Sequence, residues 1–82
     1  MERIEEFKKW LDETTDYTKE TKSNILSRLR RANNIIPIVA DELYLFNLST
    51  NEEFKVLSVS VKSQIRRAVK LFISFIKEED DK

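Results

Sequence analysis

The sequence contains no cysteine, no histidine and no glycine, and it has a single proline. Without cysteine and histidine, it lacks the usual zinc ligands and cannot form a Cys–His pair or a Ser–His–Asp triad. Without glycine, it has no phosphate-cradling glycine loop and little of the turn chemistry on which β-hairpins depend. These absences favour an all-helical fold and argue against an enzyme. We expect no catalytic residues, no metal site and no cofactor.

The length of 82 residues predicts one domain. The lack of cysteine rules out a disulfide framework, and a reducing cytosol is the default compartment. The first twenty residues are charged throughout, which is unlike a signal peptide, and no apolar run approaches the length of a membrane span. We therefore expect a cytoplasmic protein that binds neither a membrane nor a small-molecule substrate.

The net charge is zero, but acidic and basic residues are segregated along the chain. Residues 21–39 carry four bases and no acid, whereas residues 40–54 carry four acids and no base. Residues 55–77 carry six bases and no acid. A local basic surface matters more for binding a polyanion than the total charge does. The charge pattern therefore makes nucleic acid a candidate partner.

The rest of the chain is organised around a predicted helix over Ser58–Ile76. Ser58 or Ser60 is its expected N-cap, and acidic residues from Glu78 onward should fray its end. One face carries apolar residues at helical spacing: Val61, Ile65, Ala68, Val69, Phe72, Phe75 and Ile76. The opposite face is basic and polar: Ser63, Arg66, Arg67, Lys70, Ser74 and Lys77. One face can build a core while the other remains available for a partner.

Three further helices are predicted, over residues 2–12, 18–34 and 39–46, with one more helical turn at 52–55 that carries Phe54 inward. The apolar stripe of the second helix consists of Ile25, Leu29, Ala32 and Ile36, and Trp10 is expected at the edge of the core. The predicted fold is all-α: a compact orthogonal bundle of four helices over residues 1–77, followed by an acidic tail, 78–82.

The second helix has recognisable end signals. Thr18 is the expected N-cap. Because no glycine is present, Asn33 or Asn34 is expected to adopt the left-handed conformation at the C-terminal end. Pro37 then prevents the helix from continuing.

Three stretches together resemble the N-terminal core-binding domain of phage integrases and other tyrosine recombinases, a four-helix bundle of the SAM-like type. The stretches are Phe7-x-x-Trp10-Leu11; Thr18-x-x-Thr21 leading into Ile25 and Leu29; and Ser60-x-x-Ser63 leading into Ile65-Arg66-Arg67-Ala68-Val69-x-Leu71-Phe72-x-x-Phe75. They span residues 4–76 in the order and spacing typical of that family.

The resemblance implies a module that clamps one side of duplex DNA during DNA integration or recombination. The implied DNA contacts are Lys19, Lys22 and Ser23 on the second helix and Lys62, Ser63, Arg66, Arg67 and Lys70 on the last. Most would bind phosphates, with Arg66 or Arg67 as candidates for contacts to base edges. The catalytic residues of the family lie in a separate domain, so recombinase activity is not expected of this chain. The expected partners are duplex DNA, a second copy, or the catalytic domain of a parent chain.

Two alternatives remain open at this point. The basic faces are also compatible with an ordinary solvated surface. The second alternative is a helical protein-interaction module, homodimeric or otherwise, that does not bind nucleic acid. Its docking surface would be an exposed apolar patch made of Tyr44, Phe46, Leu71 and Ile73.

Overall fold

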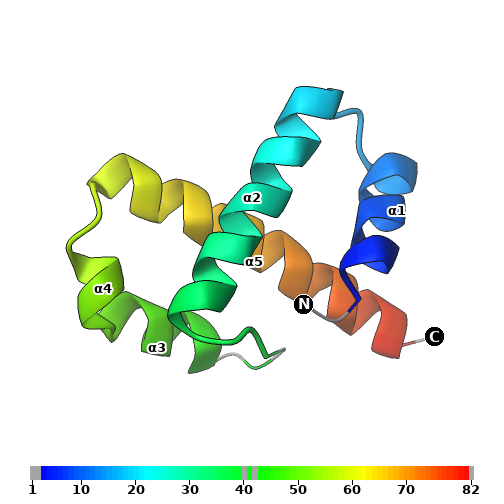
Figure 1. The fold of residues 1–82 in the computed structure, drawn as a ribbon. Helices are drawn as coiled ribbons and strands as arrows, with labels where there is room; N and C mark the ends of the chain where they lie inside the picture. Colours follow the sequence, from blue (N-terminus) through cyan, green and yellow to red (C-terminus); the bar gives the residue numbers. More distant parts are fainter. Residues whose placement is uncertain (1–2, 40, 42, 82) are drawn as a thin grey trace.

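The structure is a computed structural model that describes residues 3–39, 41 and 43–81. This part of the chain forms five helices and no strand (Figure 1). The helices are α1 (Ile4–Thr14), α2 (Lys19–Ile35), α3 (Leu43–Thr50), α4 (Glu52–Lys55) and α5 (Val59–Asp80). The prediction of an all-helical single domain is confirmed, and α4 is the extra helical turn expected at residues 52–55.

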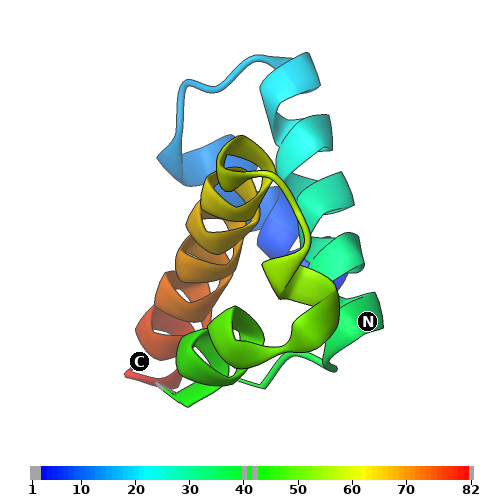
Figure 2. The ribbon, with the colours of Figure 1, turned by 90° about the vertical axis from the view of Figure 1, so that its left-hand side faces the viewer.

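The longest helix, α5, is the element against which the others pack. In Figure 1, α2 crosses the middle of α5, α1 lies beside its C-terminal half, and α3 and α4 lie toward its N-terminal half. The shortest extent of the molecule is 17 Å, which leaves room for two layers of helices at the usual interaxial distance of about 8–10 Å. Figure 2 shows α2 and α5 on opposite sides of the molecule, so each has one face turned away from the other.

The core forms where the apolar stripes of α2 and α5 meet. From α5, every residue of the predicted stripe except the half-buried Val61 is buried: Ile65, Ala68, Val69, Phe72, Phe75 and Ile76. From α2, Ile25, Leu29 and Ala32 are buried as predicted, while Ile36 is partly buried against them. Phe54 of α4 is fully buried. The helical periodicity of the sequence therefore identified the correct faces.

An aromatic cluster joins α1 to the C-terminal half of α5. The ring centroid of Phe7 lies 5.3 Å from that of Phe72, with the edge of one ring toward the other, and 5.6 Å from that of Phe75. Trp10 lies 5.7 Å from Phe75 at the margin of the core, as predicted. Aromatic pairs at these separations are favourable beyond the apolar area that they bury.

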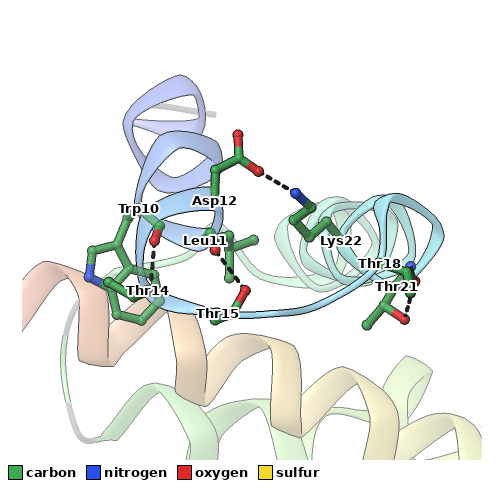
Figure 3. Close-up of polar contacts among 8 residues, drawn as sticks. All are labelled: Trp10, Leu11, Asp12, Thr14, Thr15, Thr18, Thr21 and Lys22. Carbon is green, nitrogen blue, oxygen red and sulfur yellow. Dashed lines mark hydrogen bonds and ion pairs between the residues drawn. The ribbon is translucent and has the colours of Figure 1, made fainter.

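The connection between α1 and α2 is shorter than predicted because α1 continues to Thr14. The Thr14 and Thr15 hydroxyls each donate to a backbone carbonyl four residues earlier, Trp10 and Leu11, at 2.6 Å (Figure 3). The Leu11 carbonyl also accepts from the Thr15 backbone amide at 3.1 Å, so the hydroxyls add a second bond in the last turn of the helix. The predicted start of this helix, Glu2, lies outside the described residues. Thr18 is the N-cap of α2, as expected, and its side chain accepts from the Thr21 amide at 3.1 Å.

The predicted left-handed residue at the end of α2 is wrong. The helix ends at Ile35, and Ile36 leaves it in an extended conformation with φ of −139°. Asn33 acts through its side chain instead, since its Oδ1 accepts from the Ile38 amide at 3.0 Å. A side-chain acceptor therefore fixes the path of the chain just after the helix.

The third helix begins four residues later than predicted, at Leu43 instead of Val39, and ends at Thr50. The Asp41 carboxylate accepts from the Leu43 amide at 2.8 Å, which places an acceptor at the helix start. Tyr44 then anchors the helix, because its hydroxyl lies 2.7 Å from the carbonyl of Ile36 and 3.2 Å from that of Ala32. The position of α3 thus depends on a contact with the end of α2, which periodicity within 43–48 could not reveal.

The expected fraying from Glu78 is also wrong, because α5 continues through Asp80. Its last turns are held by α1 and by Arg3, the residue before it. The indole of Trp10 donates to Glu78 Oε2 at 3.1 Å, and the guanidinium of Arg3 lies 3.8 Å from Asp80 Oδ1. Arg3 also lies over the ring of Phe75, 5.3 Å from its centroid. Contacts with α1 offset the unfavourable position of acids at a helix C-terminus.

Candidate functional site

The basic residues of α5 point in different directions because successive residues of a helix are rotated by about 100°. Lys62 and Arg66 lie on the flank that faces α4. The Lys62 ammonium lies 3.5 Å from the Lys55 carbonyl at the end of α4, and the Arg66 guanidinium lies over the ring of Phe54, 5.7 Å from its centroid. We call this side the covered flank. Its cations are engaged in holding α4 against α5.

The other flank of α5 borders an open groove against α2 and the loop before it. The groove is lined by Tyr17, Thr21, Ile25, Arg28, Gln64, Arg67, Ala68 and Leu71 and encloses about 150 Å³. A shallower depression continues from it along α5, sharing Tyr17, Arg67 and Leu71 and adding Lys70 and Ser74. We call the two together the α2–α5 groove, and the side of α5 that borders it the open flank.

The α2–α5 groove has a one-sided charge. Among the described residues, its lining includes three cations, Arg28, Arg67 and Lys70, and no carboxylate. None of the three forms an ion pair within the part of the chain that the structure describes. The nearest acids in the sequence, Asp16 and Glu20, are exposed and do not line the groove. An anion placed there would meet three cations with no competing carboxylate in the lining.

The expected contacts on α2 lie elsewhere. Lys19, Lys22 and Ser23 line a second groove, between α1 and α2, together with Lys8, Leu11, Asp12, Leu26 and Arg30. Lys22 forms an ion pair with Asp12 across this groove (Figure 3). Lys8 forms another with Glu5, with 3.4 Å between Lys8 Nζ and Glu5 Oε1. This surface is therefore partly neutralised by the acids of α1.

The structure thus divides the expected DNA contacts among separate surfaces. Arg67 and Lys70 share the α2–α5 groove, Lys62 and Arg66 lie on the covered flank, and Ser63 is exposed on the outer side of α5. The physical reason is that α2 and α5 pack through their apolar stripes. Their opposite faces must then point away from each other, so only residues flanking the stripes share a surface.

Tyr17, Arg28 and Gln64 are among the groove residues that were absent from the expected contacts. Arg28 had a signal in the sequence, because it lies between the apolar and polar faces of its helix, the position from which a side chain reaches a neighbouring helix. Tyr17 precedes the N-cap, and Gln64 is one of several polar residues on α5. Nothing in their local sequence distinguishes these two.

The apolar patch expected for a protein-interaction module does not form. Tyr44 is 1% exposed and Ile73 is 8% exposed, so both belong to the core. Leu71 lines the α2–α5 groove, and Phe46 alone is fully on the surface, at 65% exposed. The exposed apolar residues of α3 are instead Leu43 and Phe46, one helical turn apart.

Comparison with known proteins identifies no relative: no family model, no curated protein and no solved structure matches the chain. Among the described residues, no helix combines the length and apolar character needed to cross a bilayer. In the same residues, no three acidic side chains are grouped so as to hold a metal ion. The chemistry of the α2–α5 groove is therefore the basis for a functional assignment.

Proposed function

We propose that this chain is a DNA-binding module that contacts the phosphates of duplex DNA through the α2–α5 groove. The observation that carries the proposal is the convergence of Arg28, Arg67 and Lys70 on one surface that no carboxylate of the described residues lines. Arginine and lysine supply most phosphate contacts in protein–DNA complexes. Such contacts position a protein on the duplex and are largely independent of base sequence.

Gathering three cations on one surface has an energetic cost that an anionic partner would remove. Arg67 and Lys70 are three residues apart on α5, and like charges at that spacing destabilise a helix by a few tenths of a kcal/mol. Arg28 adds a third positive charge from α2. Phosphate oxygens would offset this repulsion and release the counterions of the DNA.

The resemblance to the core-binding domain of tyrosine recombinases supports the same proposal. The aromatic residues of the first and last stretches that carry the resemblance form the cluster between α1 and α5, and Thr18 of the middle stretch caps α2. We propose on this basis that the bundle is of the SAM-like type and acts in DNA integration or recombination. Arg28 is the basic residue of α2 that shares a groove with Arg67, whereas Lys19, Lys22 and Ser23 line the groove between α1 and α2.

The test is duplex binding measured by fluorescence anisotropy over a range of salt concentrations. Neutralising three phosphates gives a slope of log K against log salt of about −3. The double variant Arg28→Gln/Arg67→Gln should lower the magnitude of the slope by about 2 and weaken binding at low salt.

The matched control is Lys9→Gln/Arg30→Gln, which removes the same charge from exposed positions outside the α2–α5 groove. It should leave the slope nearly unchanged. If both double variants lower the slope equally, the binding depends on overall charge and the groove is not the site. If the wild-type protein binds no duplex at low salt, the proposal is wrong.

A second candidate function is docking of a protein partner on α3. Leu43 and Phe46 expose more than half of their surface and form one face of that helix. Neighbouring apolar residues on a helix surface are a common feature of interaction sites. Sedimentation at low and high salt tests whether the partner is a second copy of the chain. A dimer that Phe46→Glu dissociates would favour this function, and a monomer at both salt concentrations would count against self-association.

A further inference from the structure

The floor of the α2–α5 groove is apolar, and phosphate binding does not account for it. Ile25 and Ala68, which are buried, and Leu71, which is half-buried, line the groove together with polar and charged residues, which we call its rim. Tyr17 also lines it and is 41% exposed. A phosphate gains nothing from contact with apolar side chains, because it is strongly hydrated. The floor and the tyrosine ring suit a group with an apolar face.

The size and the rim of the groove narrow the choice of that group. Its volume of about 150 Å³ is well below the roughly 300–1,000 Å³ of sites that hold a whole drug-sized ligand or cofactor. One planar ring fits better. The rim offers the Gln64 amide, which can donate and accept together, and the Arg28 and Arg67 guanidinium groups. Amide side chains of this kind pair with the edge of a base, as glutamine does with adenine.

We propose that the α2–α5 groove receives one unpaired nucleobase of the bound DNA. The base would stack on Tyr17 and the apolar floor, with its edge at Gln64. Its phosphate would lie at Arg67 and Arg28. The inference rests on the proposed function for the phosphate contacts and adds that the protein prefers a duplex with an unpaired nucleotide to a continuous one.

The preference follows from the cost of extracting a base from a duplex. In continuous DNA each base is paired and stacked, and turning one outward costs a few kcal/mol. A bulged nucleotide has lost its pairing and much of its stacking, so it can enter the groove at little cost. Stacking of a base on an aromatic side chain recovers free energy that backbone contacts cannot provide.

The experiment compares two short duplexes that are identical except for one central unpaired adenine in the second. Wild-type protein should bind the bulged duplex more tightly in fluorescence anisotropy. The variant Tyr17→Ala should lose about 5- to 150-fold in affinity for the bulged duplex, the range measured for removal of a stacking ring. It should bind the continuous duplex within about twofold of wild type, since none of the three cations is changed.

Two further variants sharpen the result. Tyr17→Phe keeps the ring and should keep the preference, whereas Gln64→Ala should reduce affinity for the bulged duplex only. Tyr17 and Gln64 lie on the surface, so circular dichroism should show unchanged helix content in all three variants.

The possible outcomes separate the two proposals. Equal wild-type affinity for the two duplexes overturns the unpaired-base inference and leaves the phosphate-binding proposal standing. Equal loss on both duplexes in Tyr17→Ala also overturns it, because the ring would then act on backbone binding alone. Failure to bind either duplex at low salt overturns both.

Discussion

Arg66 and Arg67 are neighbours in the sequence, yet they lie on different flanks of α5 and do different things. Arg66 lies over the ring of Phe54 on the covered flank, beside Lys62, which reaches the end of α4. Arg67 lies on the open flank, in a groove that two other cations line and that no acid of residues 3–39, 41 and 43–81 lines. The comparison teaches that the number of basic residues on a helix does not measure its binding surface, because a rotation of about 100° assigns adjacent residues to different tasks.

The largest effect on stability is expected from removing the ring of Phe54, over which Arg66 lies on the covered flank. Phe54 is fully buried, and Phe54→Ala should lower the free energy of unfolding by about 3–5 kcal/mol, because it leaves a cavity between α4 and α5. Urea denaturation measures this. Phe46→Ala, the same change at a residue that is 65% exposed, is the matched control and should shift stability by less than about 0.5 kcal/mol. Similar losses in both variants would show that α3 and α4 are not packed as described.

The next effect concerns Tyr44, which ties α3 to the end of α2. Burial raises the pKa of Tyr44 to about 12 from its ordinary value of 10.0. Between these values the unfolded chain releases the proton while the folded chain keeps it, so the free energy of unfolding falls as the pH rises. The fall attributable to this group should reach about 2 kcal/mol by pH 12.

Denaturation of Tyr44→Phe across the same pH range isolates this contribution, because the other titrating groups remain. The variant should lack this part of the fall. At neutral pH it should be less stable by about 1 kcal/mol, since the hydrogen bond to the end of α2 is lost. A parallel fall in wild type and variant would contradict the burial of the hydroxyl.

A smaller effect separates the two flanks directly. Arg66→Gln should destabilise the fold by about 0.5–1 kcal/mol through the lost contact with Phe54, and it should change DNA affinity little. Arg67→Gln should leave stability within about 0.5 kcal/mol and weaken DNA binding. Denaturation and anisotropy on both variants check this. The reverse pattern would assign binding to the covered flank.

The smallest effect is expected in the groove between α1 and α2. Lys22→Gln removes the ion pair with Asp12, and pairs that are this exposed contribute about 0.2–1 kcal/mol. DNA affinity should change less than in Arg67→Gln, because the acid already neutralises this lysine. A larger loss of affinity in Lys22→Gln would restore the α1–α2 groove as the main contact.

Local patterns carried enough information for much of the fold. The helical spacing of apolar residues in 58–76 and 18–34 identified the buried faces of α5 and α2. Thr18 and Ser58, the latter expected as one of two candidates, cap the helices they precede. These features depend on neighbours within one or two helical turns, so a single sequence suffices to find them. The charge segregation was equally visible.

The wrong predictions concern features that depend on contacts between segments far apart in the chain. The start of α3 is set by Tyr44 reaching back to Ile36, and the last turns of α5 are held by Trp10 and Arg3 of the N-terminal region. The missing left-handed residue after α2 has the same kind of cause, since Asn33 bonds to the connection beyond the helix.

By itself, the sequence determined that the protein is helical, which faces its two long helices bury, and that its basic residues are concentrated in those helices. Only the tertiary structure decided which of those residues share a surface. Helices that pack through their apolar stripes turn their polar faces apart. Arg28 and Arg67 flank the stripes and therefore line one groove, whereas Lys19 lines the groove between α1 and α2 and Lys62 lies beside α4. A helical pattern fixes the angle of each residue about its own axis, and the packing of the helices fixes what lies opposite.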